Sequence, residues 1–230
     1  MELLRKGNVF TTYLVENSIQ EKVVVKIINA EYLKDKEKYQ KVIKQFQIEK
    51  EILKLLNFNF IPKYIDSGDI FLCMTYIKGK NLKEIKNNLS YKEKLDILIQ
   101  LSQIVQELHR IKVIHCDIKP ENIIYDNGKI FLIDFGSAML EGEKAEYIQG
   151  SKNYSAPEIY REYIRCPQND IYSVASMYNQ MIEEDKKDYR IIHGGMKKNK
   201  SERFDSIDKI LEILSEIRSK IWKDTIFMMS

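Results

Sequence analysis

The sequence predicts an α+β fold, in which a small β-rich N-terminal part with one long helix precedes a mostly helical C-terminal part. Residues 23–28 form a β-branched run, Val-Val-Val-Lys-Ile-Ile, which is typical of a buried strand. In residues 34–56, apolar side chains recur at steps of three and four, as on one face of a helix. Residues 91–111 show the same spacing, and further helices are expected from Asp170 onward and around residues 207–222.

The composition is that of an ordinary folded protein. Its 230 residues correspond to one large domain or two small lobes, and 44% apolar residues suffice for a core. The net charge is only +3 and the charges are interspersed, so we expect neither nucleic acid nor a membrane as partner. Three scattered cysteines suit a reducing compartment. We therefore expect a cytoplasmic monomer, or else a secreted effector that lacks a classical signal peptide.

Two charged residues interrupt the apolar patterns. Lys26 lies inside the run of residues 23–28, where a cation must find a partner or lose its charge. Glu49 lies in the middle of the apolar face of residues 34–56. One interpretation is that each side chain reaches solvent at an edge, and the other is that the cation and the anion pair.

Turn residues predict two strand pairs. Residues 61–69 and 70–74 are expected to form two strands joined by a tight Ser-Gly-Asp turn. The Asn-Gly dipeptide at residues 127–128, between two β-branched runs, is a strong hairpin signal. We expect Asn122 and Asp134 to flank opposite ends of this second ribbon, from where both can reach one cation.

Two motifs carry the chemistry of the chain. Residues 115–122 read His-Cys-Asp-Ile-Lys-Pro-Glu-Asn, and residues 134–136 read Asp-Phe-Gly. They supply two carboxylates, a lysine and an amide, which suit a hydroxyl, a phosphate and a metal ion. The motifs resemble the catalytic and metal-binding loops of the eukaryotic-type protein kinases, and the resemblance extends from Gly7 to Arg203.

This resemblance implies a two-lobed kinase fold, with an N-lobe at residues 1–76, a C-lobe at residues 77–230 and a hinge at about residues 75–79. It implies an ATP- and Mg²⁺-dependent serine/threonine protein kinase that transfers the γ-phosphate to a hydroxyl of a protein substrate. Serine or threonine is favoured as acceptor by Lys119 and by Ser151, which stands in a segment similar to the substrate-docking turn of that class.

The resemblance also assigns roles to single residues. Asp117 is the implied base that orients the acceptor hydroxyl, and Lys119 reaches the γ-phosphate. Asn122 and Asp134 supply hard oxygen ligands suited to Mg²⁺. The implied nucleotide contacts lie on the phosphate loop (Gly7), at the phosphate-binding ion pair (Lys26 and Glu49), around the adenine (Val24 and Ile124) and at the hinge (Met74 as gatekeeper, with the backbone of Tyr76 and Ile77).

The phosphate-covering loop departs from the family pattern. The three glycines of G-x-G-x-x-G align with Arg5, Gly7 and Phe10, so that only the middle glycine is kept. Because glycine lets the backbone approach phosphate closely, we expect a loop that is stiffer or lies farther from the nucleotide. Arg5 or Lys6 is then a candidate for electrostatic compensation.

Cys116 replaces an arginine that, in the family, receives a phosphate carried by the activation segment. We therefore expect activity without that phosphorylation; the alternative is that Cys116 is a reactive thiol. The resemblance implies structural roles for His115 beneath the site against Phe135, for Asp170 under the catalytic loop, and for Arg203 paired with Glu158.

Two other functions stay open at this point. A small-molecule kinase of the aminoglycoside phosphotransferase type shares the catalytic aspartate and the metal aspartate, but it normally lacks Lys119 and the Ala-Pro-Glu of residues 156–158. A pseudokinase, which binds partners without catalysis, would explain the missing glycines and arginine. It would leave the retained Lys26, Asp117 and Asp134 unexplained.

Overall fold

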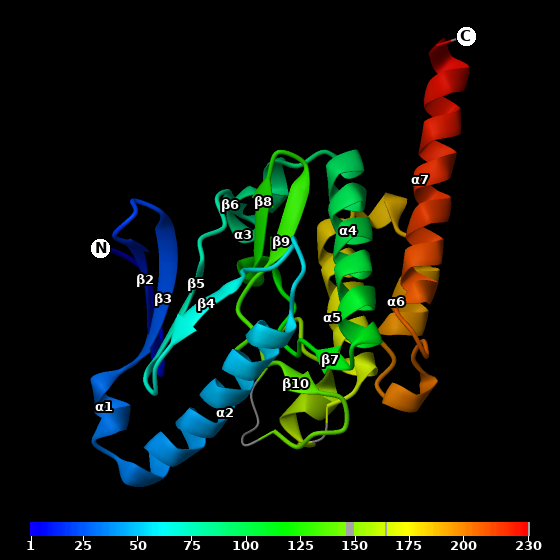
Figure 1. The fold of residues 1–230 in the computed structure, drawn as a ribbon. Helices are drawn as coiled ribbons and strands as arrows, with labels where there is room; N and C mark the ends of the chain where they lie inside the picture. The colour runs from blue at the N-terminus through cyan, green and yellow to red at the C-terminus, as the bar shows by residue number, and fades with distance from the viewer. Residues whose placement is uncertain (146–149, 164, 230) are drawn as a thin grey trace.

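The computed structural model describes residues 1–145, 150–163 and 165–229. Its N-terminal part is a five-stranded antiparallel sheet in the order β1-β2-β3-β5-β4. The strands are β1 (Glu2–Lys6), β2 (Phe10–Glu16), β3 (Lys22–Ile28), β4 (Tyr64–Ser67) and β5 (Phe71–Thr75). Two helices, α1 (Ala30–Leu33) and α2 (Lys36–Leu55), connect β3 to β4 along the lower edge of the view in Figure 1. The predicted strands on either side of the Ser-Gly-Asp turn are confirmed.

The long N-terminal helix is also confirmed, although it begins two residues later than the spacing predicts. Asp35 is its N-cap, and the side chain accepts a hydrogen bond from the backbone N–H of Lys38 at 3.1 Å. The buried side chains of α2 include Phe46, Glu49 and Leu53 of the predicted apolar face. This face brings Glu49 toward β3, which carries Lys26 at its centre.

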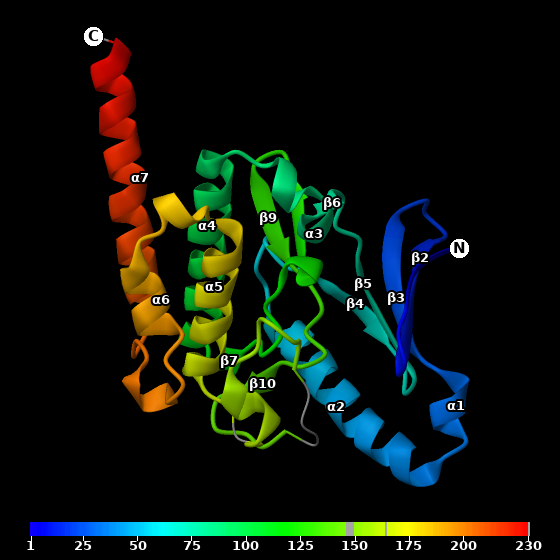
Figure 2. The ribbon, with the colours of Figure 1, turned by 180° about the vertical axis from the view of Figure 1, so that it is seen from behind.

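Helices dominate the C-terminal part, as the sequence predicts. They are α3 (Leu82–Ile85), α4 (Tyr91–Arg110), α5 (Pro167–Met181), α6 (Tyr189–Gly195) and α7 (Asp208–Met229). A capping box starts α4, in which Ser90 and Glu93 satisfy each other's backbone N–H groups. Figures 1 and 2 show α4 between α5 and α7, and α7 extends beyond the rest of the molecule.

Shorter elements complete this part. The strands are β6 (Lys80–Asn81), β7 (Val113–Ile114), β8 (Ile123–Asp126), β9 (Lys129–Leu132) and β10 (Met139–Leu140). The 3₁₀ helices are η1 (Lys86–Asn88), η2 (Pro120–Asn122), η3 (Pro157–Tyr160), η4 (Glu184–Lys186) and η5 (Lys200–Glu202). Two small sheets, β7 with β10 and β6 with β8 and β9, frame the segments that carry the two motifs.

The predicted hairpin of β8 and β9 forms, but one expectation about it is wrong. Asn127 and Gly128 both have positive φ, 47° and 85°, as a two-residue turn of this kind requires. The two strands pair antiparallel, and the backbone N–H of Ile133 donates to the carbonyl of Asn122 at 2.9 Å. Asn122 and Asp134 therefore both lie beyond the open end of the ribbon. They do not lie at opposite ends, because the turn reverses the chain between them.

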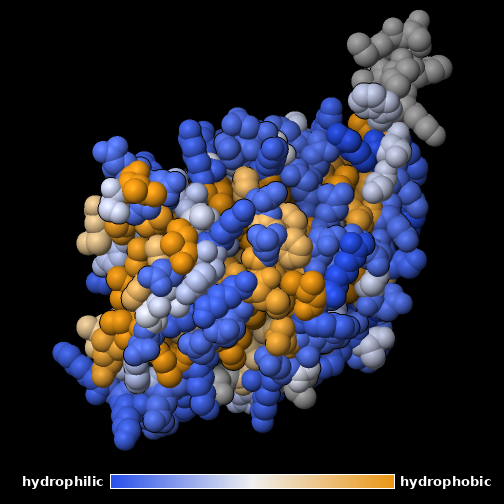
Figure 3. Space-filling model, in the orientation of Figure 1, coloured by the Kyte–Doolittle hydropathy of each residue, from blue (hydrophilic) through white to orange (hydrophobic). Residues whose placement is uncertain are grey.

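One apolar core runs through the molecule. It extends from Ile28 and Phe46 under the sheet to Leu98 and Tyr178 between the helices. In the view of Figure 3, hydrophobic residues gather over the N-terminal sheet and near the centre, and hydrophilic side chains cover most of the remaining face. None of the helices within the described residues is long and apolar enough to cross a membrane.

Candidate active site

A cavity of about 400 Å³ lies between the N-terminal sheet and the β8–β9 hairpin. The sheet supplies one wall and the segment after β5 supplies the rim, so that residues far apart in the sequence meet here. The predicted site residues that line this cavity are Val24, Lys26, Glu49, Met74, Tyr76, Ile77, Asn122, Ile124 and Asp134. The cavity has an apolar end around Val24 and Ile124 and a charged end around Asp134. A lining of this kind suits a ligand with one apolar part and one charged part.

Three charged side chains converge at the polar end. The Nζ atom of Lys26 donates to both carboxylate oxygens of Glu49, at 2.8 and 2.9 Å, and to Oδ1 of Asp134 at 3.0 Å. The Lys26 and Glu49 side chains are 10% and 1% exposed, so the prediction that they pair with each other is confirmed and the solvent-edge reading is wrong.

The charges of this triad depend on one another. Burial alone lowers the pKa of Lys26, but the carboxylates of Asp134 and Glu49 outweigh it and raise that pKa above its ordinary value. Burial raises the pKa of Asp134, yet the cations of Lys26 and Arg5 outweigh this effect and hold the pKa well below its usual range. Burial raises the pKa of Glu49, and Lys26 opposes that change. Lys26 and Asp134 are therefore fully charged at neutral pH.

A second cluster is built from the loop that follows β7. Oδ2 of Asp117 accepts hydrogen bonds from Nζ of Lys119 at 2.6 Å and from Nδ2 of Asn122 at 2.9 Å. Oδ1 of Asp117 accepts from the hydroxyl of Ser151 at 2.5 Å, and that hydroxyl also accepts from Lys119 at 2.6 Å. Ser151, Asp117 and Lys119 therefore contact one another in pairs. The carboxylate of Asp117 is thus already hydrogen-bonded to an aliphatic hydroxyl.

The oxygen ligands present fit a divalent cation that also binds phosphate. Oδ1 of Asn122 is buried without a hydrogen-bond partner, while Nδ2 of the same side chain is anchored on Asp117. Such an orphaned acceptor is costly unless a cation or a water binds it. Among the described residues, no group of three or more His, Cys, Asp or Glu side chains forms a metal cage. Asn122 and Asp134 therefore suit Mg²⁺, which typically takes few protein ligands and completes its shell with phosphate and water.

Gly7 does not lie among the residues that line the cavity. It forms the β1–β2 turn, where its N–H donates to the carbonyl of Phe10 at 2.9 Å and its own carbonyl accepts from Nδ2 of Asn29 at 2.9 Å. A Cβ atom at Gly7 would lie 3.0 Å from that Phe10 oxygen, a tight contact that favours glycine. The role of Gly7 in nucleotide binding stays a prediction.

Several residues of the cavity were not found by sequence reasoning. They are Leu4, Thr12, Pro62, Asn81, Glu84, Glu121 and Ile133, whereas Thr75 and Gly79 belong to the predicted hinge. Thr12 had one available signal, since it lies in the segment aligned with the phosphate loop. Glu121 lies within the motif of residues 115–122, but that motif assigned it no role. Glu84 belongs to α3, which has no motif, and only the packing of α3 against the hairpin shows its position.

Asp170 holds the loop of residues 115–122 in place, as predicted. Its carboxylate accepts hydrogen bonds from the backbone N–H of His115 at 2.9 Å and of Cys116 at 2.8 Å. Cys116 has a φ of 66°, and Asp134 has a φ of 63°, so both adopt the left-handed conformation that side chains disfavour. Strain of this kind concentrates at functional sites and persists only where surrounding contacts enforce it.

Cys116 is buried at 2% exposure, and burial raises the pKa of its thiol well above the ordinary value. A thiol of this kind is protonated and shielded, whereas a reactive cysteine needs an accessible thiolate. The structure therefore argues against the alternative that Cys116 is a reactive thiol.

His115 packs beneath the site, as predicted. Its ring centroid lies 4.9 Å from that of Phe135 in an edge-to-face arrangement, and its Nε2 atom has no hydrogen-bond partner. Burial lowers the pKa of His115, although three nearby aspartates oppose the change. The folded protein therefore holds this imidazole neutral.

The lowered pKa of His115 predicts a pH dependence of stability. Below about pH 6.5 the histidine binds a proton in the unfolded chain, whereas it stays neutral in the folded protein. The free energy of unfolding therefore falls as the pH falls. We expect His115→Phe to remove that contribution, up to about 1.4 kcal/mol per pH unit. Urea denaturation at pH 8 and pH 5.5 measures it. An equal pH dependence in both proteins would contradict the prediction.

A buried ion pair links two distant segments of the C-terminal part, as predicted. Arg203 donates to both carboxylate oxygens of Glu158, from Nη1 at 2.6 Å and from Nη2 at 2.7 Å. Asn169 donates to the same carboxylate at 2.7 Å, and Arg203 stacks over the ring of Tyr172 with 4.9 Å to the centroid. The pair ties η3 to the start of α5 and to the segment before α7.

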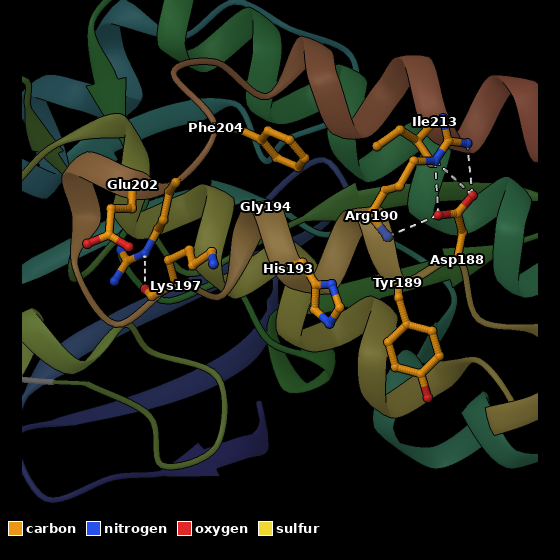
Figure 4. Close-up of a pocket in the computed structure, with 10 residues that line it drawn as sticks. Asp188, Tyr189, Arg190, His193, Gly194, Lys197, Glu202, Phe204 and Ile213 are labelled. Carbon is orange, nitrogen blue, oxygen red and sulfur yellow. Dashed lines mark hydrogen bonds and ion pairs between the residues drawn. The ribbon is translucent and has the colours of Figure 1, made fainter.

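A second hollow, drawn in Figure 4, lies between α6, the segment before α7 and α7 itself. Its arginines are engaged in ion pairs. Arg190 contacts Asp188 and Glu216, each at 2.8 Å, and Arg203 contacts Glu158. None of the residues that line it belongs to the triad of Lys26 or the cluster of Asp117. The triad of Lys26 lines the cavity under the N-terminal sheet, whereas Asp117, Lys119 and Ser151 do not line it and are linked to it through Asn122.

Several known protein kinases have sequences similar to this chain. The chain is 28% identical to the dual specificity protein kinase zak2 of Dictyostelium discoideum over 74% of its own length and 26% of that protein. It is 28% identical to the serine/threonine-protein kinase PrkC of Bacillus subtilis over 79% of its length and 30% of that protein. It is 30% identical to the serine/threonine-protein kinase STE20 of Yarrowia lipolytica over 77% of its length and 16% of that protein. The chain thus spans less than a third of each of these relatives.

The sequence model of the protein kinase domain matches residues 2–226, which is nearly the whole chain. The fold agrees with this match, because an antiparallel sheet with one long helix precedes a helical part, and the two motifs meet between them. The chain therefore belongs to the protein kinase domain family.

Proposed function

We propose that the protein is a serine/threonine protein kinase, which transfers the γ-phosphate of ATP to a hydroxyl of a protein substrate in the presence of Mg²⁺. The observation that carries the proposal is the cluster of Asp117, Lys119 and Ser151, in which a carboxylate and an ammonium bind one aliphatic hydroxyl. We further propose that residues 1–76 and 77–230 are the two lobes, joined at about residues 75–79, with the nucleotide between them.

The cluster around Asp117 is suited to orient an acceptor hydroxyl. Oδ1 of Asp117 accepts from the Ser151 hydroxyl, so a substrate hydroxyl that replaces it would direct its lone pair away from the carboxylate. Lys119 lies 2.6 Å from both Asp117 and that hydroxyl, which places a cation where phosphate charge arrives. Asn122 fixes the carboxylate from the other side.

The triad of Lys26 is suited to hold the phosphates. Lys26 is positioned by Glu49 rather than by solvent, so its ammonium is pre-oriented toward the cavity. Asn122 and Asp134 would hold Mg²⁺, which supplies charge neutralisation to phosphate oxygens when bound. Val24 and Ile124 line the apolar end and would enclose the adenine.

Radiolabelled ATP tests this proposal. Purified protein with Mg²⁺, a generic basic protein as acceptor, and acid hydrolysis of the product would identify the phosphorylated amino acid. Label on serine and threonine is the expected result. Label on tyrosine as well would extend the acceptor range, a possibility worth measuring because one relative is named a dual specificity kinase. Transfer to an aminoglycoside but not to protein would favour the small-molecule kinase.

The altered phosphate loop favours one other candidate, a pseudokinase that binds partners without catalysis. Arg5 and Phe10 stand where the family has glycines, and Gly7 lies outside the residues that line the cavity. Folded protein that binds Mg·ATP but transfers no label to any acceptor would support this candidate. A ligand at 100 times its Kd stabilises the fold by about 2.7 kcal/mol, so a thermal shift with Mg·ATP measures binding separately from transfer.

Ser151→Ala tests the acceptor side of the site alone. The variant loses the hydroxyl that Asp117 and Lys119 share, and the two charged groups then contact each other without it. We expect about a tenfold or greater decrease in kcat with protein acceptors, as for one hydrogen bond to a charged group, and unchanged affinity for Mg·ATP. Ser151→Thr keeps the hydroxyl and serves as the matched control. Equal kcat in the wild type and in both variants would show that Ser151 has no part in acceptor binding.

A further inference from the structure

Arg5 reaches from the first strand into the charged end of the cavity. Its Nη1 atom donates to Oδ2 of Asp134 at 3.1 Å, on the opposite side of the carboxylate from Lys26, which binds Oδ1. Arg5 lines the cavity together with Leu4 and Thr12. A second cation therefore stands at the place where the protein is expected to receive metal and phosphate.

A β-bulge aims this side chain at the cavity. In the pairing of β1 with β2, Leu3 is opposite Tyr13 but Arg5 is opposite Thr12, so that β1 has one extra residue. Successive side chains of a regular strand point to opposite faces, whereas Leu4 and Arg5 both line the cavity. Bulges re-aim side chains in this way and are common beside active sites. Lys6, the next residue, is exposed and does not line the cavity.

The two cations on Asp134 are held very differently. Lys26 is 10% exposed and is fixed by Glu49 as well as by Asp134. The Arg5 side chain is 60% exposed, and the Asp134 side chain is 28% exposed. An exposed ion pair of this kind is worth about 0–1 kcal/mol and exchanges readily for a better partner. Lys26 is therefore a fixed part of the site, and Arg5 is free to change partner.

We propose that Arg5 is a ligand of the nucleotide polyphosphate, and that in the nucleotide-free protein it rests on Asp134. This inference rests on the proposed kinase function. The guanidinium replaces backbone N–H groups that a loop with a single glycine does not bring to the cavity. Arg5 leaves Oδ2 of Asp134 when the phosphates enter, which frees that oxygen for a metal ion. The planar fork of an arginine matches phosphate oxygens in a way that a lysine does not.

The inference predicts selectivity by phosphate. Isothermal titration of wild-type protein, Arg5→Ala and Lys6→Ala with Mg·ATP, Mg·ADP and adenosine measures the affinities directly. We expect Arg5→Ala to weaken Mg·ATP about tenfold or more, as for a hydrogen bond to a charged group, and to leave adenosine within about twofold. Lys6→Ala removes an equal charge from the next residue and is expected to bind Mg·ATP like the wild type. Arg5→Lys is expected to fall between the wild type and Arg5→Ala.

Each other result overturns the inference in a recognisable way. Equal Mg·ATP affinity in Arg5→Ala and the wild type would show that Arg5 is no phosphate ligand, and tighter binding would show that it only blocks Asp134. Equal weakening of adenosine and Mg·ATP would indicate a structural role for the strand. A wild-type protein that binds no Mg·ATP would overturn the proposed function together with this inference, whereas the first three results leave the proposed function intact.

Discussion

Asp134→Asn is expected to abolish phosphoryl transfer while leaving the protein folded. The amide has almost the same shape as the carboxylate, but it carries no charge for a metal ion or for the two cations at 3.0 and 3.1 Å. Loss of a metal ligand that neutralises phosphate is worth several kcal/mol, which corresponds to a rate reduction on the order of 10³-fold. The measurement is transfer of labelled phosphate to a basic protein at saturating Mg·ATP.

Asp126→Asn is the matched control for this prediction. Asp126 lies at the other end of the same hairpin, next to the turn, where its carboxylate accepts a hydrogen bond from Asn127. The same chemical change at that position is expected to leave transfer within about twofold of the wild type. Comparable activity in Asp134→Asn and Asp126→Asn would contradict the proposed metal site.

Arg203→Met is expected to destabilise the fold strongly. It leaves the carboxylate of Glu158 buried at 8% exposure without its cation, and with only the amide of Asn169 as a hydrogen-bond donor. Breaking a buried ion pair from one side costs about 3–5 kcal/mol, because the remaining charge loses its compensation. Urea denaturation at pH 7.5 would report this as a lower midpoint with an unchanged slope.

A second substitution separates the loss of the pair from the stranded charge. In the double variant Glu158→Gln/Arg203→Met no charge is left, and the glutamine oxygen still accepts from Asn169, so we expect part of the lost stability to return. Lys209→Ala breaks an exposed pair with Glu212, at 3.1 Å, and is expected to cost under about 1 kcal/mol. A double variant that is less stable than Arg203→Met would show that Glu158 is satisfied without the arginine.

Local chemistry explains why the elements were predictable. Each predicted element depends on residues that lie close together in the sequence. They are the β-branched run within β3, the capped and periodic helices α2 and α4, and the Asn-Gly turn. The pairing of Lys26 with Glu49 was also within reach, because two opposite charges on apolar surfaces have few partners. The motifs of residues 115–122 and 134–136 were recognisable as short segments, because their internal spacing resembles that of the protein kinases.

Residues that meet only through packing were not predictable. The direction of Arg5 depends on a bulge in β1, and the apolar pattern of that strand does not show a bulge. The place of Gly7 outside the cavity lining depends on how the β1–β2 turn is held by Asn29. By contrast, the common end of Asn122 and Asp134 follows from the hairpin alone, because the turn brings the end of the second strand back beside the start of the first.

The sequence by itself determined the fold class, the family and the identity of the charged groups, because these properties reside in periodicity and in short motifs. Only the tertiary structure decided which of those groups share a site. It placed Lys26 and Arg5 on the two oxygens of Asp134, and it left an oxygen of Asn122 without a partner. The physical reason is that charge and hydrogen-bonding interactions act over a few ångströms, and only the packed sheet, hairpin and helices bring distant segments that close.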